Sequence, residues 1–295
     1  MRCGRAGTFM EDLRVAPPVE PETVRPVPGH PILQVLPDGE SQGGLLVAAD
    51  AHLGLGSFRP GQPSPPGSRP EEMATELLSV AKSTRADTLV FAGDLKQPIV
   101  GMTPPLKREL FEFFSALLSA GLEVGVVPGN HDVGLVRALP REVQLHPAGG
   151  LRVGRVGIFH GHAWPSNKVL RARTLVAGHL HPGFRLAAST QDLGGKSRCW
   201  LRVEFPPPVR DRRRRKHGPV LARELIVLPA LNPLTGTESL NRSAPARYRT
   251  FLWKRFVLRG TARAYLLDGT DLGPLRAPRM AANGSRQGRA GAPGP

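Results

Sequence analysis

The chain has 295 residues, a hydrophobic content of 40% and a net charge of +16. It has no apolar run of about 18 residues, so we expect no membrane span, and the first residues lack the apolar core of a secretory signal. Its two cysteines, Cys3 and Cys199, exclude a disulfide framework and a zinc ribbon. We therefore expect a protein of the reducing cytoplasm.

Ordered structure is expected to begin near residue 44. Residues 1–43 are rich in Pro, Gly and Glu without periodicity, which predicts a disordered leader. One domain then covers residues 44–270, interrupted by a basic, proline-rich insertion at about 206–219. Residues 271–295 predict a disordered basic tail.

The first half of the domain alternates strands and helices. The predicted strands are apolar runs of strand length at 45–49, 88–92, 122–127, 154–159 and 174–177. The predicted helices carry apolar side chains on one face and span 71–82 and 104–120. This alternation predicts an α/β layered fold.

The second half has few helical patterns. Strands are predicted at 199–205, 221–228, 251–258 and 263–267. The proline run 206–208 and the basic run 212–216 interrupt them within the insertion, and no internal repeat is visible.

Most of the positive charge is peripheral. Residues 196–218 carry a net +7 and residues 276–295 a net +4. Arg212, Arg213 and Arg214 lie in the first stretch and are candidate contacts to a nucleic-acid backbone if the run lies near a metal-binding rim of the fold. A solvated insertion in a chain biased toward Pro, Arg and Gly explains the same charge, and both interpretations remain open.

Six of the nine histidines lie in five short polar motifs, each at or just after an apolar run. The motifs are Asp50-Ala51-His52, Gly93-Asp94, Gly129-Asn130-His131-Asp132, His160-Gly161-His162 and Gly178-His179-Leu180-His181. Open α/β sheets present functional side chains at the carboxyl ends of their strands, so all five motifs can meet at one rim. Carboxylates, an amide oxygen and imidazoles together suit divalent transition metals.

This order of motifs resembles that of the calcineurin-like metallophosphoesterase superfamily, over residues 45–235. The resemblance implies a two-sheet sandwich flanked by helices, in four αββα layers, with a dinuclear metal site at the sheet edge. It also implies an enzyme that hydrolyses phosphate esters with a hydroxide shared by the metals. The run 228–236 further resembles the archaeal ICC-like branch, whose members are associated with DNA ligase and helicase genes.

The resemblance assigns a role to each motif residue. Asp50, His52 and His181 would hold the first metal, and Asn130, His160 and His179 the second. Asp94 would bridge the two ions, for which manganese is expected and iron, zinc, cobalt or nickel also fit. His131 would protonate the leaving oxygen, and Asp132 would orient His131 or its loop.

Isolated motifs allow simpler interpretations. Asp50 and Asp94 are also typical helix N-caps, and Asn130 after Gly129 is a typical turn residue. Within the full set of motifs we favour metal ligation.

Three further side chains are candidate substrate contacts. His162 would be a ligand in place of His160, a substrate contact or a structural residue, and His160 is favoured because it comes first after the strand. Lys96 would contact phosphate or lie in solvent, and it stands with Gln97 near where phosphatases of the family often have an Asp-Arg pair. Trp164 would stack a base or, as we favour, pack under its loop.

Three functions follow from these patterns. The first is a phosphodiesterase or nuclease that acts on DNA or RNA, with a helicase or ligase as partner. The second is a small-molecule phosphatase or nucleotide phosphodiesterase with incidental basic segments. The third is a metal-bound, non-catalytic member of a DNA-processing complex, which the intact ligand set disfavours.

Overall fold

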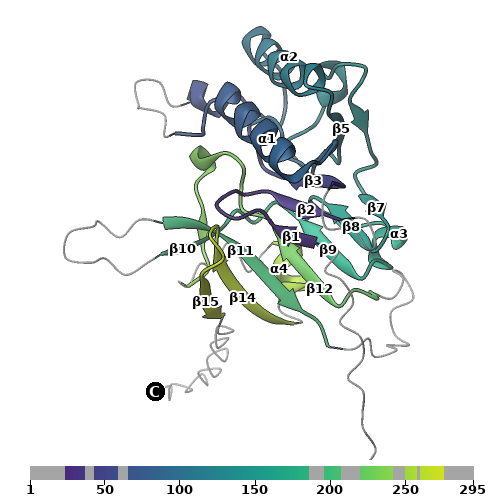
Figure 1. Cartoon of the computed structure of the whole chain (residues 1–295), viewed down its shortest axis with the longest axis vertical. Helices are drawn as coiled ribbons and strands as arrows, with labels where there is room; N and C mark the ends of the chain where they lie inside the picture. The colour runs from purple at the N-terminus through teal and green to yellow at the C-terminus, as the bar shows by residue number, and fades with distance from the viewer. Residues whose placement is uncertain are drawn as a thin grey trace, which may run out of the picture.

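The computed structural model describes residues 24–36, 43–58, 66–185, 196–206, 220–241, 250–257 and 260–275. Two sheets pack face to face and helices lie on their outer faces (Figure 1). The expected α/β sandwich in four layers is therefore confirmed. Within the described ranges, we find no helix with the length and apolar character needed to cross a membrane.

The first sheet has six strands in chain order. They are β1 (Val24–Pro26), β2 (Leu33–Val35), β3 (Leu45–Ala48), β4 (Thr88–Phe91), β5 (Glu123–Val126) and β6 (Gln144–Leu145). The strands β3 to β6 are parallel, whereas β1 pairs antiparallel with β2 and β2 antiparallel with β3. The prediction of a disordered leader is wrong for residues 24–36, because Val24, Leu33 and Val35 are buried in the core.

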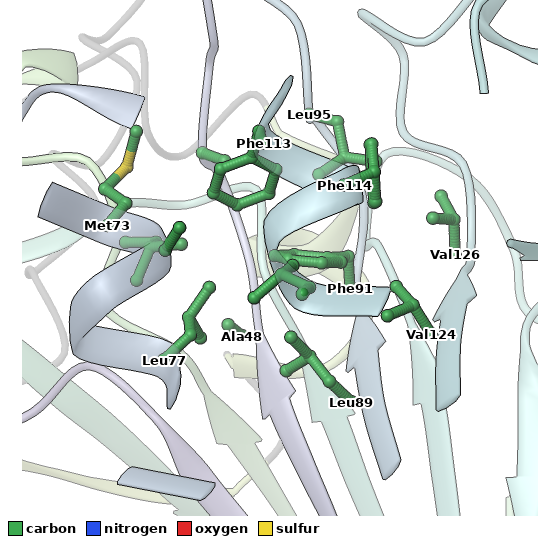
Figure 2. Close-up of a cluster of buried hydrophobic side chains, with 14 of the residues drawn as sticks. Ala48, Met73, Leu77, Leu89, Phe91, Leu95, Phe113, Phe114, Val124 and Val126 are labelled. Carbon is green, nitrogen blue, oxygen red and sulfur yellow. The ribbon is translucent and has the colours of Figure 1, made fainter. Parts of the chain in front are cut away.

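Two long helices cover the outer face of this sheet. They are α1 (Pro70–Thr84) and α2 (Pro104–Ser119), both close to the predicted ranges. Figure 2 shows Met73 of α1 and Phe113 of α2 in the same apolar cluster as Phe91 of β4. Because these helices bury one face of β3, β4 and β5, that face needs apolar side chains.

The second sheet has nine strands. They are β7 (Leu151–Val153), β8 (Val156–Phe159), β9 (Thr174–Ala177), β10 (Pro182–Arg185), β11 (Lys196–Glu204), β12 (Glu224–Val227), β13 (Glu238–Ser239), β14 (Thr261–Leu266) and β15 (Asp271–Pro274). The strands β8, β9 and β12 are parallel to one another. The prediction of a disordered tail is wrong for residues 271–274, which pair with β14.

Two short helices, α3 (Asn167–Leu170) and α4 (Phe251–Arg255), pack on the outer face of the second sheet. The strand predicted at 251–258 is wrong because its first part is α4. Thr250 caps this helix, since its side-chain oxygen accepts the N–H of Trp253 at 3.3 Å. The described part of the chain also contains 3-10 helices at Leu55–Phe58, Leu135–Arg137 and Pro233–Thr235.

The inner faces of the two sheets share one apolar core. Val47 and Val90 of the first sheet lie in the same buried cluster as Ile158 and Val176 of the second. Since helices cover the outer faces, the central strands are buried on both sides. This double burial explains why they read as continuous apolar runs in the sequence.

Candidate metal centre

The five polar motifs meet at one edge of the sandwich, as expected. Asp50, Asp94 and Asn130 follow the carboxyl ends of β3, β4 and β5, while His160 and His179 follow those of β8 and β9. The backbone stays paired beyond the strand ends, since the N–H of Asp50 donates to the carbonyl of Gly93 at 3.0 Å. The first two motifs are therefore held side by side.

One cluster of candidate ligands contains Asp50, His52 and His181, whose ligand atoms lie within 4.8 Å of one another. Nε2 of His181 is 3.3 Å from Oδ1 of Asp50 and 3.3 Å from Nε2 of His52. The backbone N–H of His179 donates to Oδ2 of Asp50 at 3.0 Å. This contact joins the two sheets at the centre of the site.

A second cluster contains Asp94, His160 and His179, again within 4.8 Å. Nε2 of His160 lies 3.3 Å from Oδ2 of Asp94 and 3.3 Å from Oδ1 of Asn130. Nδ1 of His160 donates to the carbonyl of Ala92 at 2.8 Å. A histidine held in this way presents Nε2 as a ligand, the usual arrangement at protein metal sites.

His131 and Asp132 adjoin both clusters. His131 groups with His52 and Asp94 within the same 4.8 Å limit, and its Nε2 is 3.9 Å from Oδ2 of Asp94. The carboxylate of buried Asp132 accepts the N–H of Leu95 at 2.9 Å and that of Gly129 at 2.8 Å. Of the two roles expected for Asp132, orientation of the loop is the one that matches these contacts.

The protonation states suit a cation. Burial raises the pKa of Asp94, but the hydrogen bond and charge of His160 outweigh it and hold that pKa below its usual range. Burial lowers the pKa of His160, but Asp94 and Asp50 more than compensate and raise it to about 9. Burial lowers the pKa values of His52 and His179 to about 4. The buried carboxylate of Asp94 thus lies near one neutral imidazole on each side, His52 in one group of ligands and His179 in another, so the donors fit a divalent metal.

The backbone is strained where these ligands sit. Six described non-glycine residues have positive φ angles, and five of them are candidate ligands: Asp50, His52, Asp94, His179 and His181. Such conformations persist where the surrounding structure enforces them, and they concentrate at functional sites.

Gly93 and Gly129 bring the ligand loops into contact. A Cβ on Gly93 would lie 2.4 Å from Nδ1 of His160, and one on Gly129 would lie 2.2 Å from Oδ1 of Asp94. Any larger residue at either position would displace a candidate ligand.

The candidate substrate contacts differ in their surroundings. The half-buried ring of His162 lies 5.3 Å from that of His160, outside both ligand clusters. Trp164 packs against Phe251 at 5.3 Å between ring centroids, which matches the packing role favoured above. Lys96 is 0% exposed, so its placement in solvent is wrong, and its ammonium donates to backbone carbonyls.

Arg212, Arg213 and Arg214 lie outside the described residues, but the flanks of their insertion are described. The N–H of Phe205 donates to the carbonyl of Arg223, and the N–H of Leu221 donates to that of Leu170. These contacts lie at the amino ends of β9 and β12. The ligands follow the carboxyl ends, so the insertion leaves the sheet at the end opposite the metal centre.

Sequence reasoning missed one supporting side chain, buried Asn232. Its amide donates to the carbonyl of Ala51 at 2.9 Å and its oxygen accepts the N–H of Leu234 at 2.9 Å. It therefore braces the first motif from the run 228–236. The only available signal was its place in that run.

A family model described as calcineurin-like phosphoesterase matches residues 45–201, more than half of the chain. The chain belongs to the calcineurin-like phosphoesterase family. It is accordingly a hydrolase that acts on phosphoric esters, and its edge clusters suggest a divalent metal site.

Solved structures that match the chain include a nuclease, MPE, from Pseudomonas putida and a phosphoesterase, Yfce, from E. coli. The first is 17% identical, with a TM-score of 0.47 over 77% of this chain and 87% of that one. The second is 13% identical, with a TM-score of 0.31 over 78% of this chain and 97% of that one. A search of curated proteins found no match.

Proposed function

We propose that the protein is a phosphodiesterase with two metals, which acts on nucleic acid. The observation that carries this proposal is the central position of Asp94. Its Oδ2 lies 3.3 Å from Nε2 of His160 and 3.8 Å from Nε2 of His52, so it faces both ligand clusters. A carboxylate in this position would serve both ions of a two-metal site.

The residues of the site have separate roles in hydrolysis, either as metal ligands or as the proton donor. Asp50, His52 and His181 would hold one ion, and Asn130, His160 and His179 would hold the other. When bound, two divalent ions supply a nucleophile at neutral pH and neutralise charge on the phosphate oxygens. His131 acts as the general acid in its imidazolium form. Its Nδ1–H donates to the carbonyl of Gln97 at 2.5 Å, and the proton on Nε2, which lies toward the site, passes to the leaving oxygen.

Nucleic acid is the proposed substrate because of the basic segments. Residues 196–218 carry a net charge of +7, and such a concentration of positive charge attracts the phosphates of a nucleic-acid backbone. We propose that Arg212, Arg213 and Arg214 bind this backbone away from the metals, since their insertion leaves the sheet at the opposite end. A small-molecule phosphodiesterase is the alternative, in which these arginines have no role.

The finer placement concerns the run 228–236. We propose that the chain belongs to the archaeal ICC-like branch and works with a helicase or ligase in the cytoplasm. Asn232 supports a specific role for this run, because it braces the motif that carries Asp50 and His52. Co-purification with a helicase or ligase tests this proposal.

The deciding experiment measures hydrolysis of bis-p-nitrophenyl phosphate by metal-stripped protein with and without Mn²⁺. Asp94→Asn is the test variant and Asp87→Asn, on the exposed surface, is its control. We expect turnover that depends on Mn²⁺ and is lost only in Asp94→Asn. Absence of turnover in metal-loaded wild type would refute a phosphodiesterase of broad specificity. The turnover with iron, zinc, cobalt or nickel is then compared with the turnover with manganese. Hydrolysis of DNA and RNA is compared with hydrolysis of nucleotides.

A further inference from the structure

The unusual feature beside the metal centre is a buried lysine. Lys96 follows Asp94 by two residues and its side chain is completely buried. Its ammonium donates to the carbonyl of Pro98 and, at 3.0 Å, to that of Ile99. A buried ammonium group cannot contact a bound substrate, so its role must be sought in the loop that it holds.

That loop also holds His131. The carbonyl of Gln97 accepts a hydrogen bond from Nδ1 of His131 at 2.5 Å. The N–H of Gln97 donates to the carbonyl of Leu53 at 2.9 Å, which fixes one side of the residue to the first motif. A carbonyl partner at Nδ1 selects the tautomer with its hydrogen on Nδ1 and directs Nε2 at the site.

The segment that follows Gln97 is held by Lys96. The carbonyl of Gln97 belongs to the peptide bond with Pro98, and Ile99 and Val100 beyond it are 51% and 79% exposed. The ammonium of Lys96 ties the carbonyls of Pro98 and Ile99 back to the buried side of the loop. Without that ammonium, the Gln97–Pro98 peptide is held only by the hydrogen bond from His131 itself and, through the preceding peptide, by the hydrogen bond of the Gln97 N–H to Leu53.

We propose that Lys96 is a positioning residue, which fixes the Gln97 carbonyl and thereby the orientation of the His131 ring. This inference rests on the proposed role of His131 in phosphodiester hydrolysis. It replaces the earlier expectation that Lys96 contacts phosphate.

The variants separate this role from general stability. Lys96→Met removes the ammonium and keeps an apolar side chain of similar length, whereas Lys96→Arg keeps a cation that can donate to both carbonyls. Lys107→Met makes the same change at an exposed lysine of α2 and is the matched control. If Lys96→Met does not fold, Lys96→Gln takes its place, because its amide retains a donor.

The kinetic readout is dependence on the leaving group. Methyl p-nitrophenyl phosphate releases a stable anion, whereas methyl phenyl phosphate gains more from a proton donor. General acid catalysis contributes about 10²–10⁴-fold in rate. We therefore expect Lys96→Met to lose about tenfold more kcat/KM on the phenyl ester than on the p-nitrophenyl ester. Lys96→Arg should restore the ratio, and Lys107→Met should not change it. Equal losses on the two esters would overturn the proposal.

The second readout needs neither metal nor turnover. Correlation of ring protons with imidazole nitrogens by NMR reports the tautomer of His131 in metal-free protein, and His131→Gln assigns its signals. We expect the Nδ1–H form in wild type and a mixture in Lys96→Met. An unchanged tautomer overturns the inference even where the enzyme is active. A wild type inert on both esters refutes the proposed function, and the tautomer still decides the role of Lys96.

Discussion

Asp94 accepts the backbone N–H of His131 at 2.8 Å through Oδ1, and its Oδ2 faces the imidazoles of His160 and His52. One carboxylate therefore fixes the loop of the proposed general acid and the centre of the proposed metal site. The same side chain therefore positions the proposed proton donor and the proposed metal site, so a change that moves Asp94 should disturb both.

Gly93→Ala should disrupt the metal site through His160. The new Cβ would lie 2.4 Å from Nδ1 of that ring, and the residue has a φ of +89°. Gly101→Ala is the control, because Gly101 has a φ of +87° and no atom within 4 Å of such a Cβ. Both variants should lose about 1–2 kcal/mol of stability from the left-handed backbone. Only Gly93→Ala should lose metal affinity, by about 10–100-fold as for other disturbed ligand supports. Mn²⁺ titration and thermal unfolding measure both effects, and equal affinities would contradict the contact.

Metal binding should release about one proton from His160 at pH 7. Asp94 and Asp50 raise the pKa of this buried ring to about 9 against the effect of burial, so the metal-free protein holds its proton at pH 7. A ligating imidazole must be neutral, so the proton leaves when a metal binds. His52 and His179, with pKa values of about 4, release none, whereas His181, whose pKa Asp50 raises against the effect of burial, adds to the total.

Calorimetry in two buffers with different ionisation enthalpies counts these protons. His160→Gln should reduce the count by about one, whereas His30→Gln, at the surface pair with Glu76, should leave it unchanged. The apparent metal affinity of wild type should rise with pH and level off above about 9. An affinity independent of pH from 7 to 9 would contradict the protonated state of His160.

The fold and the convergence of the motifs were predictable for a simple physical reason. Apolar runs buried on both faces identify the central strands, and the polar residues that follow them must share an edge. Other elements carry too little signal. The strands β1 and β2 have three residues each and lie in a proline-rich segment, so their few apolar side chains show no period. A strand was predicted where the helix at Phe251–Arg255 lies, because an apolar segment with two cations in it fits a helix as well as a strand.

The contacts that orient the site could not be predicted. The partners of His160 and His131 are the carbonyls of Ala92 and Gln97, and every residue of a chain has a carbonyl. The burial of Lys96 could not be predicted for the same reason, because its hydrogen-bond partners are backbone carbonyls of its own loop. Residue types therefore indicate which atoms meet the metal, whereas the tautomers depend on the folded backbone.

Asp132→Asn should weaken the loop that holds Asn130 and His131. Both oxygens of Asp132 accept backbone N–H groups, from Leu95 at 2.9 Å and Gly129 at 2.8 Å. An amide replaces one acceptor with a donor that faces an N–H, which leaves a buried group unpaired. Such a loss costs about 1–3 kcal/mol. Denaturant unfolding should show this loss, while Asp87→Asn at the exposed surface should stay within about 0.5 kcal/mol of wild type. Wild-type stability in Asp132→Asn would exclude the proposed bracing.

Replacement of Arg212, Arg213, Arg214 and Arg215 by Ser should separate nucleic-acid binding from catalysis. The flanks of this run lie at the end of the second sheet opposite the ligands, so turnover of bis-p-nitrophenyl phosphate should not change. Affinity for single-stranded DNA should fall, and its dependence on log salt should flatten by about 0.9 for each lost contact in a duplex and about 0.7 in a single strand. The matched control replaces four exposed cations of the α1–α2 region, namely Lys82, Arg85, Lys107 and Arg108. It removes the same charge and should retain most of the affinity. Equal weakening by both sets would mean that net charge alone attracts DNA. No weakening by the first set would remove these arginines from the substrate site and favour a small phosphodiester as substrate.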